Sequence, residues 1–341
     1  MRLWRNSNGS GRYGASGIAR TMAYALGAVV LVACAGEAVL RFGLGLGNPV
    51  LVQSDAACGY ILKPDQDVYR FFAHTHTNRY GMRSDEVGAH QAGTLRLLFV
   101  GDSITYGTSR VDQREIFTEI LHRDLPAIVN RPVEVLNASA GAWAPANELS
   151  YLRSRGTFDA DIVLLVLNDG DLTQPRATLG MVGDDLPQKR PATAIGELFT
   201  RYLRPRMTYW MKRKDAGDSV DSNAGQVTRD NLADLDGIEE LATQKGAWLA
   251  VIFIPFRKDI GAKSYEAEGV IRGWAASHNA ALFDLTAAES PYSAAEITLD
   301  NGIHFNGKGN RILAQSIEQN WNQVLGSYSP GVRPVASIAA H

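Results

Sequence analysis

The chain has 341 residues, of which 45% are hydrophobic and 21% are charged. This length and apolar content suffice for a large buried core and exclude a disordered chain. With 34 basic and 36 acidic residues, the formal net charge is -2, so the composition offers no basic surface for a phosphate backbone. We therefore expect a globular protein that does not take nucleic acid as a partner.

The first 20 residues are basic and precede a long apolar run. They contain four arginines and no acidic residue, and residues 21–36 that follow carry no charge. Glu37 and Arg41 then interrupt an apolar continuation. A spanning helix needs about 20 mostly apolar residues, and charges near its end can reach the interface. The pattern predicts a transmembrane signal anchor over residues 21–42, with residues 1–20 in the cytoplasm and the rest exported.

Two other interpretations of this N-terminal segment stay open. A basic region followed by a short apolar core is also typical of a cleaved signal peptide. The run Leu31-Val32-Ala33-Cys34 is similar to the lipobox of bacterial lipoproteins, in which the cysteine is acylated. All three interpretations place the folded part outside the cytoplasm. The anchor interpretation predicts a single-pass protein of the bacterial inner membrane with its domain in the periplasm.

The rest of the chain divides into a lead-in segment at 43–92, a domain at 93–325 and a flexible tail at 326–341. Apolar strands that alternate with helices argue for an α/β fold with a central parallel sheet covered on both faces. The expected strands are at 94–100, 133–136, 161–167, 247–255 and 281–284, with helices at 114–125, 146–155, 226–245 and 265–279.

Polar residues follow three of these strands directly. Ser103 closes the first strand, residues 137–141 close the second, and Asn168 closes the third. In a parallel sheet covered by helices, ligands bind beyond the carboxyl ends of the strands. The sequence therefore predicts a functional site at this edge of the sheet.

Four sequence blocks resemble those of the GDSL/SGNH hydrolases. They are GDSIT at 101–105, NASAG at 137–141, LNDGD at 167–171 and DNGIHFNGKGN at 300–310. The blocks occur in the family's order and spacing across about 95–320. The resemblance implies a three-layer α/β/α flavodoxin-like SGNH hydrolase fold, and it implies the hydrolysis of esters.

The resemblance also assigns roles to individual residues. It implies that Ser103 is the nucleophile and that His304 is its general base. A serine hydroxyl is a weak nucleophile at neutral pH, so it needs such a base within hydrogen-bond reach. The implied oxyanion hole consists of the backbone N–H groups of Ser103 and Gly141 and the side chain of Asn168.

The sequence departs from the family pattern beside the histidine. The family has an acid three residues before it, where this chain has Asn301, and Asp300 lies four residues before His304. A carboxylate orients the imidazole and stabilises its charged form, and replacing it with an amide lowers kcat by about 10⁴ in a serine protease. Either Asp300 reaches His304 through a shift in the loop, which we favour, or Asn301 or a backbone carbonyl supports a Ser-His pair.

The sequence gives no sign of a cofactor or a metal. It has no G-x-S-x-G, G-x-G-x-x-G or P-loop motif. Cys34 and Cys58 do not have the spacing of a zinc site. His74 and His76 alternate as on a strand, but no third ligand accompanies them. We expect a site built from protein groups alone.

The segment at 171–223 is too long for an ordinary loop and is expected to cover the site. It carries basic and aromatic side chains that suit an anionic glycan, sugar rings or lipid headgroups. A solvated basic helix with a packed aromatic face is the alternative. The residues concerned are Arg201, Arg204, Arg206, Lys212, Arg213, Lys214, Tyr202, Tyr209 and Trp210.

Together these features predict an exported serine esterase that removes O-acyl groups, most simply acetyl, from a cell-envelope or secreted polysaccharide. The expected partners are an acylated glycan or another small ester, and the membrane through the N-terminal helix. Acyl transfer to a glycan at the same site is one alternative. A glycan-binding or assembly subunit with weak or no catalysis is another. The sequence leaves the oligomeric state open.

Overall fold

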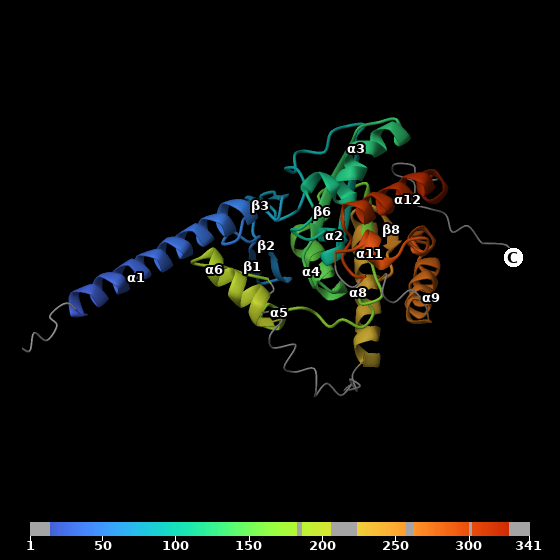
Figure 1. Cartoon of the computed structure of the whole chain (residues 1–341). Helices are drawn as coiled ribbons and strands as arrows, with labels where there is room; N and C mark the ends of the chain where they lie inside the picture. The colour runs from blue at the N-terminus through green and yellow to red at the C-terminus, as the bar shows by residue number, and fades with distance from the viewer. Residues whose placement is uncertain (1–13, 183–185, 206–223, 257–261, 300–301, 327–341) are drawn as a thin grey trace, which may run out of the picture.

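The computed structural model describes residues 14–182, 186–205, 224–256, 262–299 and 302–326. Its centre is a parallel sheet of five strands in the order β6-β5-β7-β8-β9 (Figure 1). This is the flavodoxin-like order, in which the first strand lies between the second and the third. All five strands lie where the sequence predicts them: β5 (Leu95–Gly101), β6 (Val133–Ser139), β7 (Ile162–Leu167), β8 (Trp248–Phe253) and β9 (Ala281–Asp284).

Helices cover both faces of this sheet, which confirms the predicted three-layer α/β/α fold. In β5, Leu97 and Phe99 belong to one hydrophobic cluster and Leu98 and Val100 to the other, since successive strand side chains alternate between faces. The first cluster packs under α3 (Phe117–Val129) and α12 (Gly307–Leu325), and the second under α4 (Pro145–Arg155), α8 (Ala224–Gln244) and α9 (Ala262–Ser277). Short helical segments occupy connections: α2 (Ser103–Tyr106), η2 (Gln113–Glu115), α5 (Leu179–Val182), α6 (Ala194–Glu197), η4 (Leu198–Leu203), α10 (Thr286–Glu289) and α11 (Ala294–Ile297).

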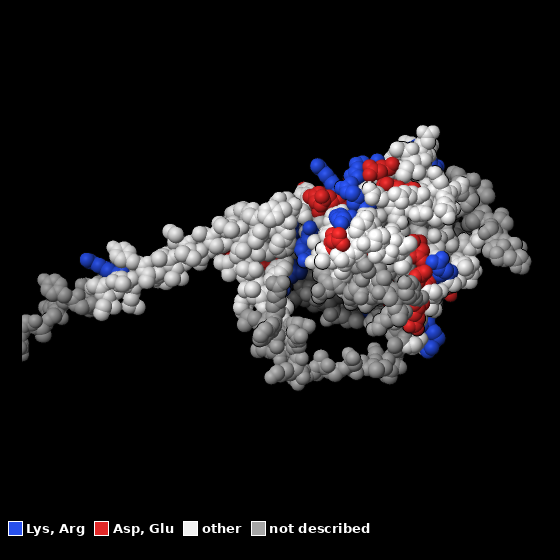
Figure 2. Space-filling view, turned by 45° about the vertical axis from the view of Figure 1, so that its right-hand side comes forward, with Lys and Arg blue, Asp and Glu red and all other residues white. Residues whose placement is uncertain are grey.

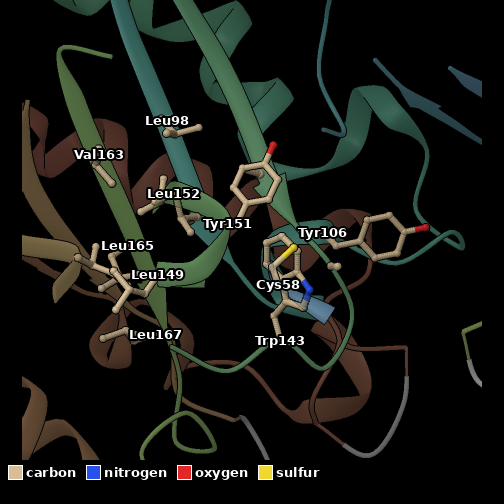
Figure 3. Close-up of a cluster of buried hydrophobic side chains, with 14 of the residues drawn as sticks. Cys58, Leu98, Tyr106, Trp143, Leu149, Tyr151, Leu152, Val163, Leu165 and Leu167 are labelled. Carbon is tan, nitrogen blue, oxygen red and sulfur yellow. The ribbon is translucent and has the colours of Figure 1, made fainter. Parts of the chain in front are cut away.

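The lead-in segment forms two antiparallel hairpins that the sequence analysis did not foresee. They are β1 (Val52–Asp55) with β2 (Gly59–Leu62), and β3 (Gln66–Arg70) with β4 (Ala73–Thr77). The first hairpin packs against the loop after β6 and the start of α4: Trp143 Nε1 donates to the Tyr60 carbonyl at 3.0 Å, and Asn147 Nδ2 donates to the Cys58 carbonyl at 2.8 Å. Figure 3 shows Cys58 beside Trp143 in the core. The lead-in is thus packed into the core of the domain.

Helix α1 (Gly14–Ala38) continues into the π-helical turn η1 (Val39–Gly43). Among the described residues, their continuous helix Gly17–Gly43 is the one that is long and apolar enough to cross a membrane. The two charges near its end have partners. Glu37 pairs with Arg41 at 2.7 Å and accepts hydrogen bonds from the backbone N–H groups of Ala194 and Ile195 at 2.8 and 3.0 Å. The acid therefore caps the first turn of α6 and joins the two helices.

The two cysteines lie apart from each other, and His74 has a partner on its own hairpin. Cys34 is exposed on α1, Cys58 is buried, and neither forms a disulfide. His74 pairs with Asp67 at 2.6 Å across the second hairpin. Within the described ranges, no group of three potential ligand side chains is placed to hold a metal ion.

Arg83 joins the lead-in to the loop that follows the first strand of the sheet. Its guanidinium is fully buried and donates to the carbonyls of Tyr106, Thr108 and Val111, each at 2.7 Å. Because these carbonyls would lose a charged donor, we expect Arg83→Met to lower the free energy of unfolding by about 3 kcal/mol. Urea unfolding of the full chain in detergent micelles measures this.

The matched control is Arg123→Met on the exposed side of α3. Arg123 makes an ion pair with its sequence neighbour Asp124 at 2.8 Å, and such surface pairs contribute less than about 1 kcal/mol. Equal losses for the two variants would show that Arg83 does not hold the loop.

Candidate active site

Ser103 begins the short helix α2 immediately after β5. Asp102 caps this helix, with its Oδ1 accepting from the backbone N–H of Ile104 at 2.8 Å. A side chain at Gly101 would collide with Thr105 and with the Val166 carbonyl, so only glycine fits there. The Gly-Asp-Ser run thus has a local reason: it turns the chain tightly and sets the serine at the strand's end.

His304 meets this serine from the far end of the chain. Its Nε2 lies 3.0 Å from the Oγ of Ser103, across 201 positions of sequence. The backbone on both sides is fixed, because the His304 carbonyl accepts from Leu299 N at 2.8 Å and Asn306 caps α12 through Gly309 N at 2.9 Å. The structure therefore brings the predicted nucleophile and base within hydrogen-bond reach.

The residues expected to orient the imidazole, Asp300 and Asn301, lie outside the described residues. The choice between them stays a prediction. Asp102, in the serine turn, is a buried acid that interacts electrostatically with His304. Burial raises the pKa of the Asp102 carboxyl, and the nearby His304 opposes that rise.

The three predicted oxyanion donors lie at the ends of three adjacent strands. Gly141 lines the same pocket as Ser103 and His304, and its carbonyl accepts from the Tyr60 hydroxyl at 2.7 Å. Asn168 lies behind them at the end of β7 and is buried. Its Nδ2 donates to Asp102 Oδ2 at 3.1 Å, and its Oδ1 accepts from Gly170 N at 2.8 Å. These two bonds fix which end of the amide faces the serine turn, and the amide has a second N–H to donate.

Two further carboxyl groups are buried behind the serine turn. Glu148 on α4 and Asp171 after β7 are almost inaccessible to solvent, and neither Glu148 carboxyl oxygen has a hydrogen-bond partner among the described residues. Burial, followed by repulsion from Asp102, raises the pKa of both groups well above the ordinary value. Sequence reasoning gave Glu148 no role, because a glutamate on a helix is ordinarily a surface residue.

Ser103 and His304 line a pocket of about 620 Å³. One side of it comes from the lead-in segment, with Val50, Leu62 and Arg70, and another from the insertion, with Leu186, Pro187, Arg201 and Tyr202. The described part of the insertion therefore lines part of this pocket, and its role as a cover stays a prediction. Arg70 was missed by sequence reasoning, since nothing in its local pattern indicates a pocket. Arg204 is exposed, and Arg206, Tyr209, Trp210, Lys212, Arg213 and Lys214 lie outside the described residues.

Comparison with known proteins gives similar structures and no similar sequences. No protein-family model matches the chain, and no curated protein matches it. TesA has a TM-score of 0.43 at 18% identity, covering 67% of this chain and 99% of its own. A lipase/acylhydrolase from Enterococcus faecalis has 0.42 at 18%, covering 69% and 98%, and an acetyl xylan esterase from Geobacillus stearothermophilus has 0.40 at 15%, covering 70% and 97%. The likeness is one of backbone arrangement.

The buried Glu148 makes stability depend on pH. Folding raises the pKa of Glu148, so the native state keeps a proton that the unfolded state releases. The free energy of unfolding therefore falls progressively as the pH rises above 4.5, the ordinary pKa of a glutamate. We expect Glu148→Gln to gain stability relative to the unchanged protein between pH 5 and pH 8, by on the order of 1 kcal/mol or more. Thermal unfolding across this range measures the difference.

Glu240→Gln, on the exposed face of α8, is the control and should show no such trend. A difference between Glu148→Gln and the unchanged protein that stays constant with pH would contradict the assignment.

Proposed function

We propose that this protein is a serine esterase of the SGNH type, with Ser103 as nucleophile and His304 as general base. The supporting observation is the 3.0 Å separation of Ser103 Oγ and His304 Nε2 at the wall of a pocket that Gly141 also lines. Three of the four sequence blocks supply residues that line this pocket, although the blocks lie far apart in the chain, and Asn168 of the remaining block donates to Asp102. An alcohol beside a base and backbone donors is the arrangement that acyl transfer requires.

The reaction follows from these positions. Ser103 Oγ attacks the ester carbonyl carbon while its proton passes to His304 Nε2, and the carbonyl oxygen becomes an oxyanion held by N–H donors. The C–O bond to the alcohol then breaks, and His304 returns the proton to the leaving alkoxide. Water attacks the acyl-enzyme in the same way, releasing the carboxylic acid and restoring the Ser103 hydroxyl.

The oxyanion donors in this proposal are the N–H groups of Ser103 and Gly141 and the Nδ2 of Asn168. The Asp102–Asn168 hydrogen bond supports the role of Asn168, because it holds the amide before any substrate arrives. Such prior orientation is what gives an oxyanion hole its effect on rate.

The proposed place of action is outside the cytoplasm, at the membrane through which α1 passes. The apolar length of residues 17–43 and the arginines before it support this orientation. The substrates accessible there are O-acyl esters of the cell envelope, including acetylated polysaccharide. The pocket of about 620 Å³ is large enough for an acyl group together with part of its alcohol.

Ser103→Ala tests the nucleophile. We expect it to lower kcat on 4-nitrophenyl acetate by about 10⁴-fold or more and to abolish labelling by a fluorophosphonate, because no other group forms the acyl-enzyme. The matched control is Ser109→Ala, a serine of the same pocket, which should stay within about tenfold of the unchanged protein. Equal activity of the two variants, with labelling retained in both, would remove the esterase proposal.

Asp300→Asn tests the orienting acid that we favour. We expect kcat to fall about 10⁴-fold, because an amide cannot stabilise the imidazolium charge. Asn301→Ala should change kcat less than tenfold. The reverse order of effects would assign support of His304 to Asn301 instead.

A further inference from the structure

Large apolar side chains that are exposed outside α1 gather in one region of the domain. Six of them, which we call the apolar collar, are Val39, Phe42, Phe72, Ile195, Phe199 and Leu203. Phe42 is 82% exposed and Phe72 is 72% exposed, so the collar does not belong to the core of the chain. Among the remaining described residues beyond α1, only Tyr69, on the hairpin of Phe72, and Val270, on α9, are large, apolar and exposed.

The collar comes from three segments that polar contacts hold together. Glu37 binds the backbone of Ala194 and Ile195, which joins the end of α1 to α6. The Leu44 carbonyl accepts from Phe71 N at 2.9 Å, which joins the turn after η1 to the second hairpin. Arg70 pairs with Glu197 at 2.8 Å in a fully buried contact, which joins that hairpin to α6. The collar is therefore one fixed surface.

The helix formed by α6 and η4 has reversed polarity. Ile195, Phe199 and Leu203 follow each other at spacings of four and are exposed, so they share a face. On the opposite face, Glu197 is completely buried and Arg201 pairs with it at 3.2 Å. A helix in water places its charges outward and its apolar residues inward. Apolar side chains outward and an ion pair inward suit a lipid environment.

The collar is continuous with α1. Figure 1 shows that α6 begins beside α1, near its domain end. The helix then runs away from α1, transverse to its axis. On the face shown in Figure 2, the base of α1 and the adjoining surface are nearly free of charge, and charged side chains gather farther along the domain. A bilayer crossed by α1 would have its surface at the level of residues 39–43, where the collar lies.

The collar also adjoins the pocket. Arg70 Nη2 donates a hydrogen bond to the Tyr202 hydroxyl at 2.9 Å. Both residues line the pocket with Ser103 and His304. Arg201, on the face of the same helix opposite the collar residues, lines it as well. The wall of the pocket and the collar are thus two sides of the same helix and hairpin.

We propose that the apolar collar rests in the lipid–water interface and holds the pocket at the membrane surface, so that the enzyme takes esters borne on membrane-anchored amphiphiles. This rests on the proposed esterase function and on α1 as the anchor. The shared chemistry is an O-acyl ester attached to a lipid, whether the ester belongs to the lipid itself or to a glycan that the lipid carries.

The position of the collar is tested with the full chain in phosphatidylcholine nanodiscs. In a Cys34→Ser background, in which the remaining Cys58 is buried, Phe199→Cys and Val270→Cys each carry a bimane label. We expect brominated lipid to quench the label at position 199 several-fold more than the label at position 270, and aqueous iodide to do the opposite. Equal iodide quenching at both positions would overturn the proposal, and so would a label at 199 shielded from both quenchers, which would indicate a protein partner.

The source of the substrate is tested with one fluorogenic acetate ester, either free in water or attached to a lipid in the same nanodiscs. For Phe199→Asp combined with Leu203→Asp, we expect the ratio of activity on the lipid-attached ester to activity on the free ester to fall about tenfold, because two apolar side chains no longer hold the interface. Val270→Asp should leave the ratio unchanged. An unaltered activity ratio in the double variant overturns the inference. If the protein without substitutions is inactive on both esters, the esterase function itself is overturned.

Discussion

The site depends on one topological constraint, the position of β5 between β6 and β7. Because the first strand lies between the second and the third, the chain leaves the sheet in opposite directions from neighbouring strand ends and opens a crevice there. Ser103, Gly141 and Asn168 follow these three strands; Ser103 and Gly141 line the pocket there, and Asn168 is buried against Asp102. His304 lies in the loop before α12, which packs on α3, and its Nε2 lies 3.0 Å from the Oγ of Ser103.

The elements nearest this crevice were predictable because their signals are local. β7 is apolar at every position, and strands covered on both faces must be. Gly101 and the Asp102 cap are also local, since the turn admits no side chain at 101 and the cap spans two residues. By contrast, the hairpins of the lead-in are short, and β3 alternates buried and exposed residues that include charges on both faces. The first hairpin is held by contacts with Trp143 and Asn147, which no local pattern shows.

The same distinction explains the missed side chains. Arg70 and Glu197 form a buried ion pair across 127 positions, and neither residue has a neighbouring motif. Glu148 lies on α4, whose sequence is mostly polar. Its burial follows from the packing of α8 on α4 and not from an apolar pattern in the sequence of α4. Burying carboxyl groups behind Ser103 costs stability, and proteins ordinarily tolerate such a cost where activity depends on it.

The buried ion pair also bears on how the domain would be held if α1 is the anchor, as we propose. A single spanning helix followed by a flexible linker would fix only the distance between a domain and the bilayer. Here η1 passes directly into the domain, and Arg70 is bound to Glu197 beneath the collar while it lines the pocket. Tilting the collar away from the pocket would separate that pair, and breaking a buried pair costs about 3–5 kcal/mol. With α1 in a bilayer as proposed, the orientation of the pocket is fixed together with its height, so an ester in the same membrane would meet Ser103 at an effective concentration that a dissolved substrate does not reach.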